Sequence, residues 1–465
     1  MTASATPPRR VFMPLRRAAT GAPRPAAGID PARVLFGKVV LVCVLPMFAQ
    51  TFHYMNEYPA PYFMSKAWPF LTMPLALYGM ARLGLPVRGV FLLVLAYALG
   101  FTPFISILQL GNGFFDALTT TIKAWPISYY FSFSVVLAFL AVPVPQVRRI
   151  IIGCGIATYS IMILLFLIAP KSWYSDSAAG GKLLMYEIER GYRVYMPMFF
   201  GMILLFFLAR TAVVKRSIFH GIAAASLFLP QIFVYKQRTA IAAAFIVTAF
   251  AVVSSLPRQL RRLAYGVGLI VAIAGLFVMA RKLGLVGDNS NALEESLGGS
   301  LTVRQNSLRL AFAYLGDNPM RWAFGVGATT RFSTVTLNDI FGNHQFFIAD
   351  LGWVGVVFEY GLVGAGLLAA LYISCLVYIH RIARRSGDLM TYAMGDLVLY
   401  VLMSSAVYSV VFTPGEMASA MALAVYMDRR RNAEAPAGPA PFVSRPAPGA
   451  RHVTLGRFIA PRRNG

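Results

Sequence analysis

Residues 149–169 read RIIIGCGIATYSIMILLFLIA, an apolar run that carries a single charge, the arginine at its start. An α-helix rises about 1.5 Å per residue, so about 20 such residues cross the roughly 30 Å hydrocarbon core of a bilayer. Arg148 and Arg149 open the run and Pro170 follows it. This stretch therefore predicts a helix that spans a membrane.

The composition of the whole chain fits that prediction. Of its 465 residues, 58% are hydrophobic and 13% are charged, whereas soluble domains carry about 25% charged residues. The net charge of +24 comes from short basic clusters between apolar runs, which is the pattern that sets membrane orientation. We therefore expect the lipid bilayer as a partner and no nucleic acid. The cysteines stand inside apolar runs, and no spacing typical of a metal site occurs.

Apolar runs of similar length recur along the chain and predict an all-α polytopic membrane protein with about twelve transmembrane helices. The predicted spans are 34–51, 68–82, 88–107, 124–142, 149–169, 195–214, 218–235, 239–256, 263–280, 355–379, 390–412 and 415–428. The last span is short. Without it, however, Arg429, Arg430 and Arg431 would lie on the opposite side from the other basic clusters.

Basic residues gather in alternate connections between these spans. They are Arg82 and Arg88, Arg148 and Arg149, Lys215 and Arg216, Arg258, Arg261 and Arg262, and Arg381, Arg384 and Arg385. Cytoplasmic loops carry an excess of lysine and arginine, so these connections and both termini are predicted to be cytoplasmic. The expected location is the inner membrane of a bacterium. All five tryptophans lie on or near the predicted outer side.

The predicted transmembrane domain covers 34–428. The segments 1–33 and 429–465 are rich in proline, alanine and arginine and are expected to be disordered basic cytoplasmic tails. Two outer (periplasmic) connections are long, 170–194 and 281–350, and the second precedes the tenth helix. It contains a predicted amphipathic helix over 302–315. Loops of this length are usually functional.

His344 is the only histidine in a long outer loop directly before a helix. Its ordinary pKa of about 6.5 suits a general base that deprotonates a hydroxyl. The alternative is an interfacial histidine whose ring nitrogens are simply hydrogen-bonded.

Lys236 and Arg238 stand in a tight outer turn, against the positive-inside bias. A guanidinium binds phosphate through two parallel hydrogen bonds, and the alternative is that both side chains extend to lipid headgroups. Arg304 opens the amphipathic segment of the long loop, where a solvated helix face is the competing interpretation. Arg190 and Arg193 open the sixth span, as substrate ligands or as the partners of nearby glutamates.

Asp350 and Glu359 flank the stretch 351–355 at the start of the tenth span. A carboxylate at membrane depth costs free energy, so its presence there suggests a functional role. Structural pairing with an arginine competes equally with that hypothesis.

Three motifs occur in a recognisable order over about residues 186–370. They are Gln237-Arg238 opening a helix of small residues; Arg304, then Asn318-Pro319-Met320 and Gly325-Val326-Gly327; and Asn343-His344, then Asp350-x-Gly352-x-x-Gly355 and Gly361-Leu362-Val363-Gly364. In these motifs the chain resembles the O-antigen ligase/polymerase superfamily, which includes bacterial exopolysaccharide polymerases. That family often shows His-Asn followed by a glutamate, whereas here the order is Asn343-His344 and the acid is Asp350. The departure leaves the acid's role open and favours the polymerase branch.

The resemblance implies a polysaccharide polymerase: a glycosyltransferase, independent of metal and cofactor, that uses an undecaprenyl-diphosphate-linked glycan as donor. It would transfer this glycan to a carrier-linked repeat unit at the periplasmic face. His344 would deprotonate the acceptor hydroxyl, while Arg238 and Arg304 would hold the diphosphate and offset the charge of the leaving group. Arg193 would contact the donor or its lipid carrier. A flippase and a chain-length regulator are the expected protein partners.

Two alternatives remain open at this point. An O-antigen ligase would use the same donor but transfer the glycan to lipid A-core or to a protein hydroxyl. A transporter of lipid-linked polysaccharide fits the number of spans, although transporters place polar sites at the bilayer midplane. The charged residues singled out here are concentrated at the outer face.

Overall fold

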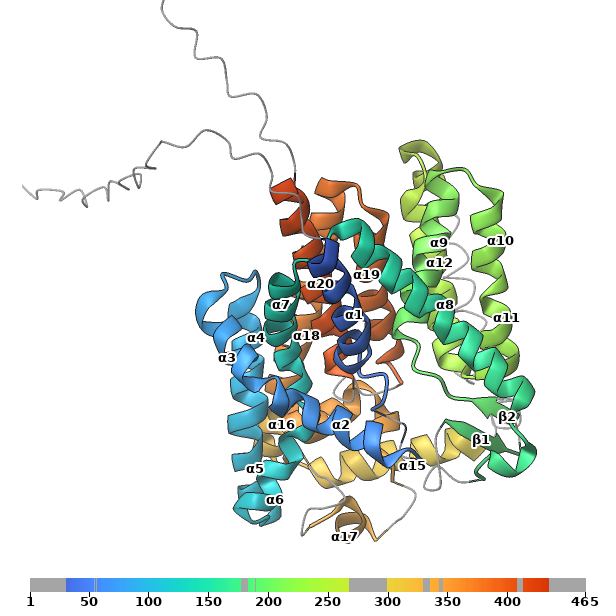
Figure 1. Cartoon of the computed structure of the whole chain (residues 1–465). Helices are drawn as coiled ribbons and strands as arrows, with labels where there is room; N and C mark the ends of the chain where they lie inside the picture. The colour runs from blue at the N-terminus through green and yellow to red at the C-terminus, as the bar shows by residue number, and fades with distance from the viewer. Residues whose placement is uncertain are drawn as a thin grey trace, which may run out of the picture.

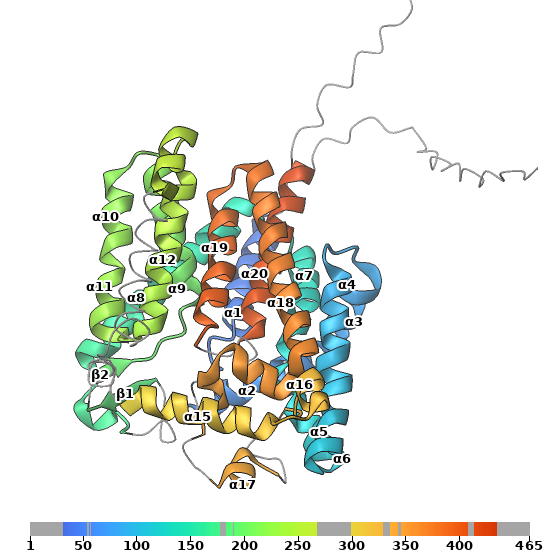
Figure 2. The same ribbon diagram turned by 180° about the vertical axis from the view of Figure 1, so that it is seen from behind.

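The structure is a computed structural model that describes residues 31–53, 55, 57–176, 183–188, 190–266, 299–328, 335–342, 346–407 and 413–434. Within these residues the chain is a bundle of helices with one antiparallel hairpin at its edge (Figures 1 and 2). The prediction of a mainly helical protein is confirmed.

The first part of the chain contains α1 (Pro31–Phe48), α2 (Pro59–Leu71), α3 (Met73–Arg82), α4 (Arg88–Ala96), η1 (Tyr97–Phe101), α5 (Thr102–Leu110), α6 (Phe114–Thr120), η2 (Thr121–Lys123), η3 (Trp125–Ser128), α7 (Tyr129–Leu140), α8 (Val144–Ile168) and η4 (Lys171–Trp173). The middle part contains β1 (Leu184–Glu187), β2 (Gly191–Val194), α9 (Phe199–Val214), α10 (Ile218–Ser226), α11 (Phe228–Pro230), η5 (Gln231–Tyr235) and α12 (Arg238–Ser255). The last part contains α15 (Gly299–Leu315), α16 (Pro319–Phe324), α17 (Leu337–Phe341), η6 (Ile348–Leu351), α18 (Trp353–Ser386), α19 (Leu389–Ser404) and α20 (Pro414–Glu434).

Six helices of the described residues are long and apolar enough to cross a membrane. They are Pro31–Phe48, Arg88–Leu110, Val144–Ile168, Ile218–Tyr235, Arg238–Ser255 and Trp353–Ser386. A seventh is added if Phe114–Lys123 and Trp125–Leu140, bent by 54° from each other, form one broken span. The count of about twelve stays a prediction, and the predicted span 263–280 lies almost wholly outside the described residues. So do most of the predicted tails, although α20 continues to Glu434, past the predicted start of the second tail.

Helix α20 lies in the centre of the bundle. Every residue from Met417 to Met427 is buried, as expected of a helix that is apolar on all sides. Its small residues, among them Ala418, Ala420 and Ala424, allow close approach of neighbouring helices, and it packs against α7, α18 and α19. The Ser419 hydroxyl donates a hydrogen bond to the carbonyl of Phe48, 2.7 Å away, which ties α20 to α1.

The two ends of the bundle differ in charge and in content. The turns α3–α4, α9–α10 and α18–α19, the start of α1 and the end of α20 lie at one end, and β1, β2, α15 and α17 lie at the other (Figure 1). At the first end, Asp388 accepts a hydrogen bond from Arg148 of α8 at 2.5 Å and forms an ion pair with Arg431 of α20 at 2.6 Å. The basic connections and the described parts of the long loops therefore lie at opposite ends of the bundle, as the sequence predicts.

Helix α18 is broken at Gly361, whose φ of 68° and ψ of 179° are not helical. The carbonyls of Phe358 and Glu359, which the break leaves without helical partners, accept from the N–H groups of Val326 at 2.8 Å and Gly327 at 3.1 Å. Backbone groups at membrane depth need such internal partners because lipid offers none. A Cβ at Gly361 would lie 2.2 Å from the Ala323 carbonyl oxygen. Close packing against α16 therefore explains why a glycine stands at this position of the motif.

Candidate functional site

The turn between η5 and α12 reverses the chain within two residues. Lys236 adopts a left-handed conformation, with φ of 55°, and its N–H donates to the Gln231 carbonyl at 2.9 Å, which closes η5. Gln237 is extended, and α12 begins at Arg238. The turn therefore places two cations, Lys236 and Arg238, where η5 ends and α12 begins.

The hairpin brings a third cation to this turn. β1 and β2 pair in the register Glu187↔Gly191, and the turn between them contains Arg190. The Nζ of Lys236 donates to the Arg190 carbonyl oxygen at 2.9 Å. The rings of Tyr195 and Tyr235 stack with centroids 5.6 Å apart. These two contacts fix the hairpin against η5 and α12.

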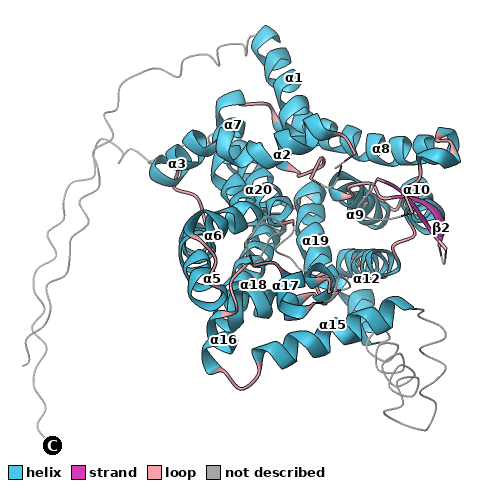
Figure 3. Cartoon of the chain, turned by 90° about the horizontal axis from the view of Figure 1, so that it is seen from below, coloured by secondary structure: helices cyan, strands magenta, loops and turns pink. Residues whose placement is uncertain are grey.

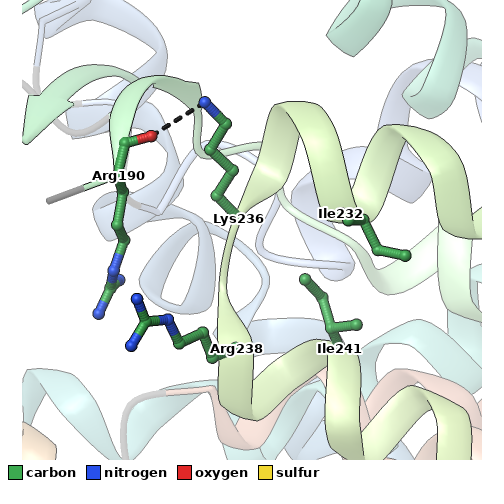
Figure 4. A pocket seen from close by; sticks show the side chains of 5 residues that line it. All are labelled: Arg190, Ile232, Lys236, Arg238 and Ile241. Carbon is green, nitrogen blue, oxygen red and sulfur yellow. Dashed lines mark hydrogen bonds between the residues drawn. The ribbon is translucent and has the colours of Figure 1, made fainter. Parts of the chain in front are cut away.

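The three cations line one pocket, which we call the cationic pocket. Its volume is about 360 Å³, and its lining residues are Arg190, Ile232, Lys236, Arg238 and Ile241. The guanidinium groups of Arg190 and Arg238 point toward one another across it, while the two isoleucines lie on the neighbouring helices (Figure 4). No carboxylate is among the lining residues. Two facing guanidinium groups repel each other unless an anion lies between them.

One carboxylate stands behind the pocket. Glu187 forms ion pairs with Arg193 and with Arg190, whose Nε lies 3.5 Å from the Oε2 of Glu187. Arg193 is only 6% exposed, and its Nε and Nη1 find no hydrogen-bond acceptor in the part of the chain that the structure describes. Arg193 therefore pairs with a nearby glutamate, which was one of the two interpretations of its sequence position. Arg190 pairs with Glu187 and also lines the pocket, so both interpretations apply to it.

Arg238 is exposed, and its side chain makes no hydrogen bond or ion pair within the described ranges. Its position also places it at the first turn of α12, where the leading N–H groups have no helical acceptor. Gln237 supplies no side-chain cap there. The positive end of the helix dipole thus adds to the charge of the side chains.

The other predicted residues do not line this pocket. Arg304 is half-buried in the amino-terminal half of α15, which runs across the bundle helices and extends toward the hairpin side (Figures 1 and 3). Asp350 is half-buried in η6, directly before α18, and interacts with other groups. His344, with its neighbours Asn343 and Gln345, lies outside the described residues.

Glu359 is 1% exposed and accepts from the Nζ of Lys123 at 3.0 Å. Structural pairing was the alternative expected from the sequence, but the cation is a lysine instead of an arginine. Lys123 itself was not singled out from the sequence. Its signal is a lone positive charge at the start of a long apolar run, which the cost of charge in lipid makes conspicuous.

A second buried ion pair was also missed. Arg210 of α9 donates to both carboxylate oxygens of Asp396 of α19, at 2.5 and 2.7 Å, and its Nη1 donates to Ser255 of α12 at 3.1 Å. Both charged side chains are almost fully buried. This pair joins three helices and lies apart from the cationic pocket.

In the described ranges, no group of three or more His, Cys, Asp and Glu side chains is arranged to hold a metal ion. No protein-family profile matches the chain, and no curated protein matches it.

Proposed function

We propose that the cationic pocket binds the diphosphate of a lipid-linked glycan, and that the protein is a polysaccharide polymerase. It would transfer an undecaprenyl-diphosphate-linked glycan to a carrier-linked repeat unit at the periplasmic face of a bacterial inner membrane. One observation supports this most: Arg190, Lys236 and Arg238 converge on a pocket that no carboxylate lines.

The chemistry of the pocket suits a phosphate. Each guanidinium offers two parallel N–H donors that match a pair of phosphate oxygens. Lys236 adds a point charge, and the start of α12 adds free backbone N–H groups. A volume of about 360 Å³ is at the lower end of the range for small-ligand sites. It suits a charged headgroup whose lipid and sugar parts extend beyond the pocket.

The proposed reaction breaks the bond between the donor sugar's anomeric carbon and its diphosphate oxygen, and the bonding electron pair leaves with the diphosphate. The acceptor hydroxyl oxygen forms the new bond to that carbon and loses its proton to a base. His344 remains the residue proposed as that base. Arg190, Lys236 and Arg238 would offset the charge that develops on the leaving oxygen.

The proposed orientation has about twelve spans, with both termini in the cytoplasm. It is supported by the basic turns, which share one end of the bundle with the start of α1 and the end of α20 (Figure 1). Asp176 and Arg216 are both exposed. Asp176 precedes β1 and Arg216 stands in the α9–α10 turn, and these segments lie at opposite ends of the bundle (Figure 1). In intact cells, an impermeant thiol reagent should label Asp176→Cys but not Arg216→Cys. The reverse pattern would overturn the orientation.

The function is tested with purified protein in nanodiscs, supplied with a lipid-linked repeat unit, with chain length read on a gel. Arg238→Ala should abolish polymer. Arg309→Ala removes an exposed arginine of α15 that does not line the pocket and should leave polymer unchanged. Polymer of normal chain length from Arg238→Ala would contradict the proposal.

A deletion strain distinguishes the polymerase from the ligase. Single repeats on the carrier indicate a polymerase, whereas full-length chains left on the carrier indicate a ligase.

Transport is the second function that we consider, because two broken apolar helices meet at the Lys123–Glu359 pair. Transporters often build their sites from interrupted helices. If the protein is a flippase, Lys123→Ala should stop the movement of a fluorescent lipid-linked glycan across liposomes that contain it. No movement with the unmodified protein rejects transport, whereas unchanged movement in the variant rejects the Lys123–Glu359 pair as the transport site.

A further inference from the structure

The apolar surface of α8 does not stop where the helix ends. Leu167 and Ile168 in its last turn are largely exposed, as expected for side chains that face lipid. Beyond Pro170, Trp173 of η4 is 61% exposed, and Ile188 in the turn of the hairpin is 93% exposed. Ile188 is the one apolar residue of the turn 187–190, whose other members are Glu187, Glu189 and Arg190, so an apolar side chain and charged groups stand together there, as they do where a bilayer meets water. Exposed apolar side chains therefore continue from the last turn of α8 to Trp173 and Ile188.

A contact of Lys236 gives the depth at which the hairpin lies. The Nζ of Lys236 is 5.9 Å from the centroid of the Phe166 ring, in the last turn of α8, and 2.9 Å from the Arg190 carbonyl oxygen. The hairpin turn and the cationic pocket are therefore level with the end of an apolar helix of membrane-spanning length.

The side chains around the hairpin have the composition of a membrane interface. Tyr186 and Tyr192 face each other across the two strands, with ring centroids 4.8 Å apart, and Tyr174 packs on Tyr192 at 4.9 Å. The Nζ of Lys171 lies 5.8 Å from the Tyr192 ring centroid. Tyrosine and tryptophan concentrate where a bilayer meets water, and cations there meet lipid phosphates.

We propose that η4 and the β1–β2 hairpin form an interfacial anchor, seated in the headgroup layer of the bilayer with Trp173 and Ile188 inserted toward the acyl chains. The partner is the lipid surface. A sugar-binding role would use the tyrosine rings, but it gives no reason for a fully exposed isoleucine at the tip. Because Arg190 belongs to the same turn, the anchor sets the cationic pocket at the depth of lipid phosphates. That consequence rests on the proposed function, whereas the seating of the hairpin does not.

The depth of Ile188 can be measured directly. A nitroxide is attached to Ile188→Cys in the full chain, with Cys43→Ser and Cys154→Ala; the fully buried Cys375 is retained. The protein is placed in nanodiscs of phosphatidylethanolamine and phosphatidylglycerol. Collision of the label with oxygen, which partitions into lipid, is compared with collision with a water-soluble nickel chelate. The control is Asp317→Cys, an exposed position in the α15–α16 turn.

The label at Ile188 should favour oxygen and report a position about 5–10 Å inside the phosphate level, while the control should favour nickel. Equal nickel access at both positions would overturn the anchor. Shielding at Ile188 that depends on added lipid-linked glycan would overturn it too, in favour of sugar binding. The assay needs no glycan transfer. An inserted hairpin together with normal polymer from Arg238→Ala would therefore reject the proposed function and retain the anchor.

Discussion

Lys123 and Glu359 meet at interruptions in two different apolar helices, with the Nζ of Lys123 3.0 Å from the Oε1 of Glu359. Lys123 ends η2, just before the 54° bend to Trp125–Leu140, and Glu359 stands two residues before the break of α18 at Gly361. The Glu359 side chain is 1% exposed and that of Lys123 18%. The pair therefore joins two irregular segments where an uncompensated charge would be costly.

Removing Lys123 should destabilise the protein more than removing an exposed ion-pair partner. Lys123→Met leaves a buried carboxylate without this cation, and loss of one partner of a buried pair costs about 3–5 kcal/mol. Thermal unfolding in detergent, followed by tryptophan fluorescence, measures the effect. Adding Glu359→Gln to the same chain should recover part of the loss.

The control for that experiment is Arg430→Ala, which breaks the exposed Arg430–Glu434 pair of α20. Exposed pairs contribute about 0–1 kcal/mol, so the melting temperature should scarcely change. Equal effects of Lys123→Met and Arg430→Ala would show that the Lys123–Glu359 pair contributes no more than an exposed one.

Two glycines of α18 should respond in opposite ways to alanine. Gly361→Ala places a side chain in a backbone region that is essentially restricted to glycine, at a cost of about 1–3 kcal/mol. The added Cβ would also lie 2.2 Å from the Ala323 carbonyl oxygen. Gly366 is helical, and a Cβ added there would meet nothing within 4 Å, so Gly366→Ala should stabilise by up to about 1 kcal/mol. Similar melting temperatures for both variants would contradict the assigned break.

The positions of the apolar helices follow from local sequence. Each predicted span other than 263–280 contains a helix in the structure, because a long run of apolar residues by itself identifies a helix that can face lipid. The breaks do not follow from local sequence. The interruption at Gly361 depends on Val326 and Gly327, which lie far away in the chain and supply N–H groups to the freed carbonyls. The hairpin was also unforeseen, although the alternation of Tyr186, Arg193 and their neighbours contains a strand signal.

The site could be predicted in part for a similar reason. Lys236 and Arg238 are conspicuous because they break the charge rule for outer loops. Arg190 joins them only because the hairpin docks on η5 through the hydrogen bond from Lys236. The partner of Glu359 could not be inferred either, since Lys123 is 236 residues away. Sequence patterns identify charges that need an explanation, but tertiary contacts decide which of them come together.

The start of α17 should loosen in acid. The hydroxyl and the N–H of Thr336 both donate to the Oδ2 of Asp339 at 2.7 Å, and these bonds, the hydroxyl first, lower the pKa of Asp339. A lowered pKa means that the carboxylate stabilises the folded turn above the ordinary value of about 3.9. That contribution is lost as the pH falls through the lowered pKa.

Hydrogen exchange of residues 336–341, followed by mass spectrometry between about pH 5 and pH 3, should therefore show falling protection after correction for the intrinsic pH dependence of exchange. Asp339→Asn should remove most of this pH dependence. A pH profile that is the same in the variant and the unmodified protein would show that another group controls the turn.

The geometry of Arg238, and not only its charge, should decide anion affinity. Arg238→Lys keeps the positive charge but loses the planar fork that pairs with two phosphate oxygens. We expect the affinity for inorganic diphosphate, measured by calorimetry in detergent, to fall about tenfold, or about 1.4 kcal/mol. Arg238→Gln should lower it further and reduce its dependence on salt, because one cation is gone. Arg309→Lys changes an arginine outside the pocket and should bind like the unmodified protein. Equal affinities for Arg238→Lys and the unmodified protein would mean that the pocket senses only net charge, and a phosphate-shaped site would then have no support.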